Sequence, residues 1–273
     1  MQTLNSALII GDAHGSVRYL RSALELAALY ELDGVIVAGD FGYWSPTAAI
    51  CFEAAQSEAE WGVPVAFLDG NHENHPALKA AVAAVTGSLT APLGPVQLDG
   101  SLWYLGRGAR FNLAGHTTVA LGGAHSIDRA SRMPGGTWFP DEVLSDADLA
   151  RAVEGGTAEI LLTHDAPGGW IIPGLSPEDQ LPTKWQAELP LCHEHRERLS
   201  AAYALLQPQV VIHGHYHSGY RLDRTEAWGA VKIIGLDCDR PGWAYSREVG
   251  GHPSMVRVGA VDGTLVLDTV RLG

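Results

Sequence analysis

The sequence predicts an α/β protein in which two β-sheets pack face to face and helices lie outside them. Three observations support this fold class. Short apolar runs alternate with helical periodicity early in the chain, strand-like runs dominate the later part, and polar residues follow the strand ends. The chain has 273 residues, of which 46% are apolar, so a large core can form. No composition break, linker or repeat divides it, and we expect one domain over residues 1–273.

In the first third of the chain, apolar runs and helical segments alternate. The expected elements are strands at Ala7–Ile10, Gly34–Ala38 and Val63–Leu68, and helices at Ser16–Leu32, Pro46–Trp61 and Pro76–Val85. Such alternation predicts a parallel sheet with right-handed crossovers. Ligands of parallel sheets gather outside the carboxyl ends of the strands.

The later part of the chain contains more strands than helices. Strands are expected at Leu102–Leu105, Phe111–Leu113, Thr117–Gly122, Glu159–Thr163, Val210–Ile212, Val231–Leu236 and Thr264–Val270, and helices at Ser145–Val153 and Glu194–Leu206. Ser145 and Asp148 have the spacing of a capping box, which marks the first of these helices.

Charge and cysteine content limit the partners and the cellular compartment that we expect for the protein. The 18 basic and 31 acidic residues give a net charge of −13, which disfavours broad nucleic-acid binding and docking on anionic membranes. Cys51, Cys192 and Cys238 lie far apart without a CxxC pair, so a disulfide framework is not expected. Without a signal peptide or a bilayer-length apolar run, we expect a cytoplasmic protein that is not a membrane protein.

Five strand ends carry the short motifs GDAHG, GDFG, GNHE, THD and GHYH. Their side chains are carboxylates, imidazoles and an amide, which suit Mn, Fe, Zn and similar ions. Glycine beside these ligands allows the sharp turns that bring a short side chain inward. In VVIHGHYHSG, His213 precedes the motif proper and is expected to be structural.

In this order, D-x-H, G-D, G-N-H-[DE], H and G-H-x-H resemble the calcineurin-like metallophosphoesterase superfamily, and the match runs from Asp12 to His217. The resemblance implies a four-layer αββα sandwich with two divalent metal ions, Mn²⁺ being expected and Fe, Zn, Ni, Co or Mg remaining possible. It implies that the first metal ion is bound by Asp12, His14 and His217, and the second by Asn71, His164 and His215. It also implies that Asp40 bridges both ions and that His72 is catalytic beside the leaving group.

The physical argument agrees with a bridging role for Asp40. Two neighbouring cations repel one another, and a carboxylate between them offsets that repulsion. A neutral oxygen from Asn71 avoids cancelling the positive charge, so the site still attracts phosphate in an acidic protein. The cations also lower the pKa of bound water, which makes hydroxide available as the nucleophile.

Substrate contacts are expected from Asn71 and His72, and also from Arg129 and Arg132 in the segment GGAHSIDRASR. Arginine suits phosphate through its planar fork. Surface arginines on a mobile loop are the competing interpretation. His125 in this segment is ambiguous. Asp165 is expected either to cap a turn or to support a ligand, and His75, His116, His193, His195 and His252 are expected to have surface or packing roles.

The sequence departs from the superfamily at Tyr43. Many relatives carry G-D-x-x-D, whose second aspartate orients the catalytic histidine, and Tyr43 stands at that position. Either Glu73 or Asp69 replaces that acid, or His72 acts without a carboxylate partner. The GD-x-x-DRG motif of the protein Ser/Thr phosphatases is absent. The segments GDFGYW and LGGAHSIDR are more similar to bacterial and bacteriophage phosphoesterases.

These observations predict a two-metal phosphoesterase that cleaves phosphodiesters or monoesters of small, nucleotide-like molecules by attack of a metal-bound hydroxide. One alternative is a DNA or RNA end-processing phosphatase or nuclease, which the acidic charge disfavours. Another is a non-catalytic metal-binding scaffold of the same fold. The oligomeric state stays open. Hydrolysis of bis-p-nitrophenyl phosphate with Mn²⁺ would separate enzyme from scaffold.

Overall fold

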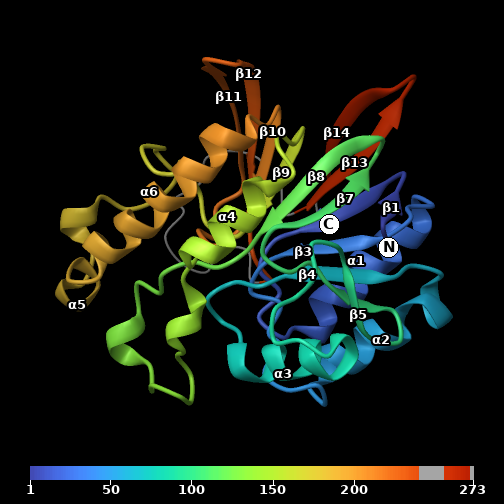
Figure 1. The fold of residues 1–273 in the computed structure, drawn as a ribbon, viewed down its shortest axis with the longest axis horizontal. Helices are drawn as coiled ribbons and strands as arrows, with labels where there is room; N and C mark the ends of the chain where they lie inside the picture. The colour runs from blue at the N-terminus through green and yellow to red at the C-terminus, as the bar shows by residue number, and fades with distance from the viewer. Residues whose placement is uncertain (240–254, 271–273) are drawn as a thin grey trace.

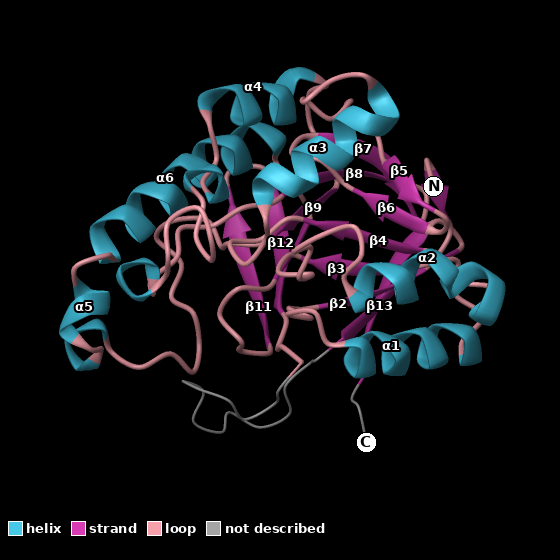
Figure 2. Ribbon diagram, turned by 90° about the horizontal axis from the view of Figure 1, so that it is seen from below, coloured by secondary structure: helices cyan, strands magenta, loops and turns pink. Residues whose placement is uncertain are grey.

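Two seven-stranded β-sheets lie face to face, and helices pack against both outer faces (Figure 1). The computed structural model describes residues 1–239 and 255–270. Three apolar cores separate the layers: one between the sheets, and one between each sheet and its helices. The predicted αββα sandwich is thereby confirmed, and Figure 2 shows α1 and α2 on the side opposite α6.

The first sheet contains most strands of the N-terminal part and the last two strands of the chain. In spatial order its strands are β14 (Thr264–Val270), β13 (Met255–Val261), β2 (Ala7–Ile10), β3 (Val35–Ala38), β4 (Val65–Leu68), β6 (Leu102–Tyr104) and β5 (Val96–Asp99). The four strands from β2 to β6 run parallel, and β13 and β5 pair antiparallel with their neighbours β2 and β6. The helices that cover this sheet are α1 (Val17–Leu29), α2 (Ala49–Trp61) and α3 (His75–Thr86).

The second sheet contains most of the later strands. In spatial order these are β1 (Thr3–Leu4), β7 (Ala109–Leu113), β8 (His116–Leu121), β9 (Ile160–Thr163), β10 (Val210–His213), β12 (Gly229–Gly235) and β11 (Tyr220–Glu226). Its helices are α4 (Asp146–Glu154) and α6 (Leu189–Leu206), and the short α5 (Thr183–Gln186) lies at the far end of α6 (Figure 1). The central strands β8, β9, β10 and β12 are parallel.

The strands β2, β3 and β4 are apolar at every position because both of their faces are buried. In β2, Leu8 and Ile10 face the helices while Ala7 and Ile9 face the other sheet. Because side chains alternate across a strand, one run of four residues contributes to two cores. The helix α4 begins with the predicted capping box, in which Ser145 and Asp148 bond each other's backbone N–H groups.

Some elements differ from the expectation. The sequence patterns do not predict the strands Tyr220–Glu226 and Met255–Val261, since the first is polar and mostly exposed at a sheet edge, and the second is interrupted by Arg257 and Gly259. Helix α6 begins at Leu189 instead of Glu194, because a proline is tolerated in the first turn, where its missing N–H would have no partner.

Among the described residues the three cysteines form no disulfide. Within residues 1–239 and 255–270, no helix has both the length and the apolar character needed to cross a membrane.

Candidate metal centre

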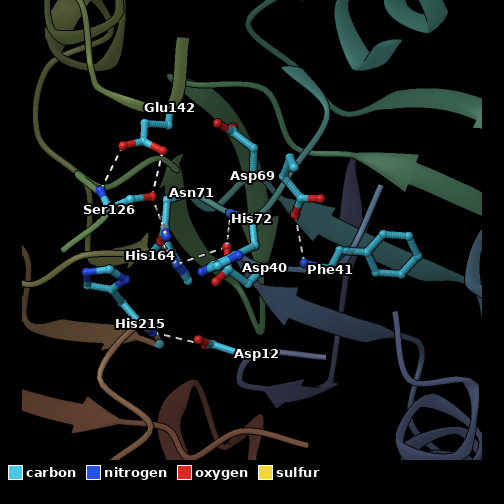
Figure 3. Close-up of polar contacts among 12 residues, drawn as sticks. Asp12, Asp40, Phe41, Asp69, Asn71, His72, Ser126, Glu142, His164 and His215 are labelled. Carbon is cyan, nitrogen blue, oxygen red and sulfur yellow. Dashed lines mark hydrogen bonds and ion pairs between the residues drawn. The ribbon is translucent and has the colours of Figure 1, made fainter. Parts of the chain in front are cut away.

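Polar side chains from both sheets meet at the carboxyl ends of the central strands (Figure 3). Within each sheet these strands are parallel, so their carboxyl ends lie at one edge. The residues that follow them are Asp12 and His14 after β2, Asp40 after β3, Asn71 after β4, His164 after β9, and His215 and His217 after β10. The structure therefore brings together all seven residues predicted to bind metal.

An outer group is formed by Asp12, His14 and His217. Nε2 of His217 lies 3.0 Å from Oδ2 of Asp12, and Nε2 of His14 lies 4.0 Å from the same oxygen. Their potential ligand atoms all lie within 4.8 Å of one another, close enough to hold one metal ion. Nδ1 of His14 pairs with Asp239 at 3.1 Å, which leaves Nε2 to face the group.

An inner group is formed by Asp40, Asn71 and His164, with His215 beside it. Nε2 of His164 lies 3.1 Å from Oδ1 of Asn71 and 3.3 Å from Oδ1 of Asp40. The rings of His164 and His215 are 5.0 Å apart. Asp12, Asp40 and His164 also form a cluster compact enough for one ion, so Asp12 stands near both groups.

Asp40 lies between the two groups. Its Oδ2 is 3.5 Å from Nε2 of His14 in the outer group, while its Oδ1 is 3.3 Å from Nε2 of His164 in the inner group. The backbone N–H of His72 also donates to Oδ1 at 2.7 Å, which holds the carboxylate in place. Each group therefore receives one oxygen of the same carboxylate.

The donor atoms of the inner group fit a cation. Nδ1 of His164 lies 2.9 Å from the carbonyl oxygen of Ala38, which can only accept, so Nδ1 carries a proton. In the neutral imidazole, Nε2 then turns its lone pair toward the oxygens of Asn71 and Asp40. Three lone pairs at about 3 Å repel one another unless a proton or a metal ion lies among them.

The pKa values of the predicted ligand side chains agree with a cation site. Burial alone would raise the pKa of Asp12 and lower that of His14 and His217. The charge of His164 and the hydrogen bond to His217 instead bring the pKa of Asp12 to about 2. Hydrogen bonds to Asp239 and Asp40 raise the pKa of His14 to about 11, and the bond to Asp12 raises that of His217 to about 10. The buried carboxylates thus hold cationic partners, and metal ions take the place of such protons when they bind.

Backbone strain is concentrated at the same residues. His14, Asp40, His215 and His217 have φ between 47° and 71°, the left-handed region that non-glycine residues seldom occupy. Each such residue costs about 1–3 kcal/mol, which surrounding structure must hold in place. Four of the seven predicted ligands carry this strain, which is typical of functional sites.

Two glycines make room for the carboxylates. A Cβ at Gly70 would lie 2.0 Å from Oδ1 of Asp40, and a Cβ at Gly214 would lie 2.2 Å from Oδ1 of Asp12. No other residue fits at these positions without moving a predicted ligand. This explains why glycine precedes Asn71 and His215 in the sequence motifs.

His72 borders the cleft, and Tyr43 does not reach toward it. Tyr43 is buried and stacks on the ring of Phe67 in the helix-side core. Glu73, one candidate for the missing acid, accepts the backbone N–H groups of Phe41 at 2.7 Å and Tyr43 at 2.5 Å. Glu73 therefore orders the loop after β3 that carries the predicted bridging residue.

Asp69, the other candidate, is also engaged elsewhere. It accepts the hydroxyl of Tyr104 at 2.8 Å and the guanidinium of Arg107 at 2.7 Å. His72 has a lowered pKa because burial disfavours its charged form, against the opposing charge of Asp40. Glu73 and Asp69 therefore bond other residues of the surrounding loops. The backbone N–H of His72 donates to Asp40.

The two arginines predicted to contact substrate have protein partners. Arg129 bonds Glu188 at 2.8 Å and lies over the ring of Trp138. Arg132 lies behind Asn71, and one of its terminal nitrogens donates to the backbone carbonyl oxygen of Asn71 at 3.2 Å. Neither arginine is among the described residues that line the cleft. Substrate contact by either arginine stays a prediction.

Several residues that support the ligands carry no motif. Ser126 and Glu142 lie behind Asn71, and Asp239 lies behind His14. Asp165 instead caps a turn, because its Oδ1 accepts the backbone N–H of Ala166 at 2.7 Å; it also accepts from Tyr216 and from Nδ1 of His195 at 2.8 Å. Glu142 and Asp239 approach the centre through tertiary contacts, so no local pattern in the sequence marks them.

Some histidines take the places expected of them. His213 is buried and bonds the hydroxyl of Tyr220, and His75 is buried beside Asp69. His125 pairs with Glu188 at 2.9 Å, which resolves its ambiguity in favour of a structural contact. His252 lies outside the described residues.

A cleft of about 680 Å³ opens over both groups of ligands. His14, Asp40, Asn71, His72, His215 and His217 lie among the residues that line it. Another wall comes from the segment between β9 and α6 and from the first residue of α6, and it is mainly apolar, with Leu175, Leu181, Trp185 and Leu189. The acidic residues Asp128 and Glu178 also border the cleft.

The chain matches one protein family in sequence and is similar to several solved structures. The model of the calcineurin-like phosphoesterase family matches residues 6–219. No curated protein matches the chain. Among solved structures, the protein TT1561 of Thermus thermophilus is 15% identical with a TM-score of 0.51, over 98% of this chain and 100% of that chain. A novel archaeal phosphodiesterase is 12% identical with a TM-score of 0.43, over 97% of this chain and 99% of that one.

Identity this low shows the fold alone, so the family match carries the assignment. The matched residues extend from before β2 to just beyond the last predicted ligand, and they include every strand end described above. The family hydrolyses phosphate esters with divalent metal ions, which the donor atoms of both groups suit. The chain belongs to the calcineurin-like phosphoesterase family.

Proposed function

We propose that this protein is a two-metal phosphoesterase acting on small, nucleotide-like phosphate esters. The position of Asp40 between the two ligand groups carries the proposal, since one oxygen faces each group at 3.3–3.5 Å from a histidine nitrogen. A shared carboxylate is what two adjacent cations need. Asp12, His14 and His217 would hold the first ion, and Asn71, His164 and His215 the second.

When bound, the ions would supply Lewis acidity toward the phosphoryl oxygens and would lower the pKa of water. The protein supplies position. Asp40 sets the separation of the two ligand groups, and Asn71 contributes an oxygen without adding negative charge where phosphate binds. His72 borders the cleft and is the group proposed to donate a proton to the departing oxygen.

The walls of the cleft support a substrate with one phosphate and an organic group. Trp185 and the neighbouring leucines offer an apolar surface on which a base or another ring can stack. Asp128 and Glu178 would repel further phosphates, and a net charge of −13 opposes long nucleic acids. We include a cytoplasmic location in the proposal, because Cys51, Cys192 and Cys238 form no disulfide among the described residues, which suits a reducing compartment.

The test is hydrolysis of bis-p-nitrophenyl phosphate by protein loaded with Mn²⁺. Wild type should turn over, and Asp40→Asn should lose most activity together with occupancy of the second ion. Asp223→Asn is the matched control, because it removes the same charge from an exposed edge strand. If the protein is inactive with Mn, Fe, Co, Ni and Zn, the non-catalytic scaffold is the correct function. Preferred cleavage of DNA or RNA ends would favour the end-processing alternative.

A further inference from the structure

We propose that Glu142, acting through Ser126, orients the side-chain amide of Asn71 so that its oxygen faces the metal centre. This inference rests on the proposed two-metal function. An asparagine side chain has nearly the same shape when it is flipped, but only its oxygen can bind a cation. The orientation therefore depends on hydrogen-bond partners, which makes Glu142 a positioning residue.

Glu142 sets which atoms donate and which accept in the hydrogen bonds that lead through Ser126 to Asn71. One carboxylate oxygen accepts the backbone N–H of Ser126 at 2.7 Å, and the other lies 2.7 Å from the Ser126 hydroxyl (Figure 3). Burial raises the pKa of Glu142 overall, although both bonds from Ser126 and the charge of Arg132 lower it. The guanidinium of Arg132 lies 3.6 Å from Glu142 and favours the carboxylate form, which can only accept, so the single hydroxyl proton of Ser126 points at Glu142.

The Ser126 oxygen is then left as an acceptor. It receives Nδ2 of Asn71 at 3.0 Å and a terminal nitrogen of Arg132 at 2.5 Å. Because Nδ2 of Asn71 is directed at Ser126, Oδ1 is directed the opposite way, to within 3.1 Å of Nε2 of His164. The polarity of one carboxylate is thus transmitted through a hydroxyl to a predicted metal ligand.

Burial makes this choice of orientation strict. Glu142 and Ser126 are fully buried, and Asn71 is 3% exposed, so a reversed amide would find little water to satisfy it. A flipped Asn71 would set its oxygen against the Ser126 lone pairs and its NH₂ against the cations. Buried groups left unpaired in this way are far more costly than those at the surface.

The near-isosteric change Glu142→Gln reverses the polarity. The backbone N–H of Ser126 cannot turn, so it must keep the oxygen of the introduced amide. The NH₂ of that amide then faces the Ser126 hydroxyl, whose proton is released toward Asn71. Asn71 would meet that proton with its own oxygen and turn its NH₂ to the metal centre.

The experiment is a double-mutant cycle between Glu142→Gln and Asn71→Asp, read by calorimetric titration of metal-free protein with Mn²⁺. In the wild-type background, E142Q should weaken binding of the second ion about 10–100-fold. The carboxylate introduced by Asn71→Asp has two equivalent oxygens, so either orientation presents an oxygen to the metal centre. It can also accept the hydroxyl proton of Ser126 that E142Q releases. In the N71D background, E142Q should therefore cause little or no further weakening.

Two controls separate positioning from loss of structure. Glu53→Gln removes another buried carboxylate, one that binds Arg21 far from the centre, and should leave Mn²⁺ binding unchanged. Ser126→Ala should weaken the second ion as E142Q does, and thermal unfolding of each metal-free variant monitors the fold. Equal weakening by E142Q in both backgrounds, or none in the wild-type background, would overturn the inference. If wild type itself bound fewer than two ions, the proposed function would fail instead.

Discussion

The inner and outer groups of the metal centre differ in how they are held. The inner residues Asp40, Asn71 and His164 are at most 3% exposed and are fixed by contacts from both sheets. The side chains of His14 and His217 are about one-quarter exposed, at 26% and 24%. We expect the inner site to be rigid and selective, and the outer site to exchange its ion more readily, because exposed ligands are less constrained.

The largest effect should come from removing one histidine of each group. His164→Ala should abolish hydrolysis and occupancy of the inner ion, since a buried cavity between two carboxylates remains. His217→Ala should weaken the outer ion but recover activity at high Mn²⁺ concentration. The measurement is activity against Mn²⁺ concentration for both variants. Equal recovery of both would show that the two groups do not differ in this way.

Metal removal should have the next largest effect. A chelator should release the ions in two steps, with the outer ion leaving first, and the melting temperature should fall in each step. An ion held at 100 times its dissociation constant stabilises the folded state by about 2.7 kcal/mol. Manganese content and thermal unfolding followed together would check this order. A single concerted release would contradict the distinction between the groups.

Asp239→Asn should have an intermediate effect confined to the outer group. Asp239 holds Nδ1 of His14, and loss of such a partner typically weakens metal binding about 10–100-fold. Calorimetric titration should show a weaker outer ion with the inner ion unchanged. Asp223→Asn on the edge strand is the charge-matched control. Weakening of the inner ion alone would refute this role of Asp239.

The smallest effect is expected at the apolar cleft wall, which is formed by residues other than the predicted ligands. Trp185→Ala should raise KM about 2–10-fold for a nucleoside phosphodiester, because stacking contributes about 0.5–1.5 kcal/mol. An ester with only methyl groups should be unaffected, which makes the substrate the internal control. A change in kcat for both esters would place Trp185 among residues that act on the reaction itself.

Much of the fold follows from local patterns. Runs such as Ala7–Ile10 and Val35–Ala38 are apolar at every position because both faces are buried, and such runs are readable without a structure. The polar edge strand Tyr220–Glu226 has no comparable pattern, since its pairing is decided by β12. The sequence predicts helix α6 too short because Pro190 conceals its first turn.

The sequence by itself determined the family, the two-sheet architecture and the order of the seven candidate ligands, because each ligand lies beside a strand end whose periodicity is local. Only the tertiary structure decided that Asp40 offers one oxygen to each group, that Glu73 and Asp69 bond elsewhere, and that Glu142 reaches Asn71 through Ser126. The reason is physical: hydrogen-bond direction and distance arise between segments far apart in the chain, and no local pattern records them.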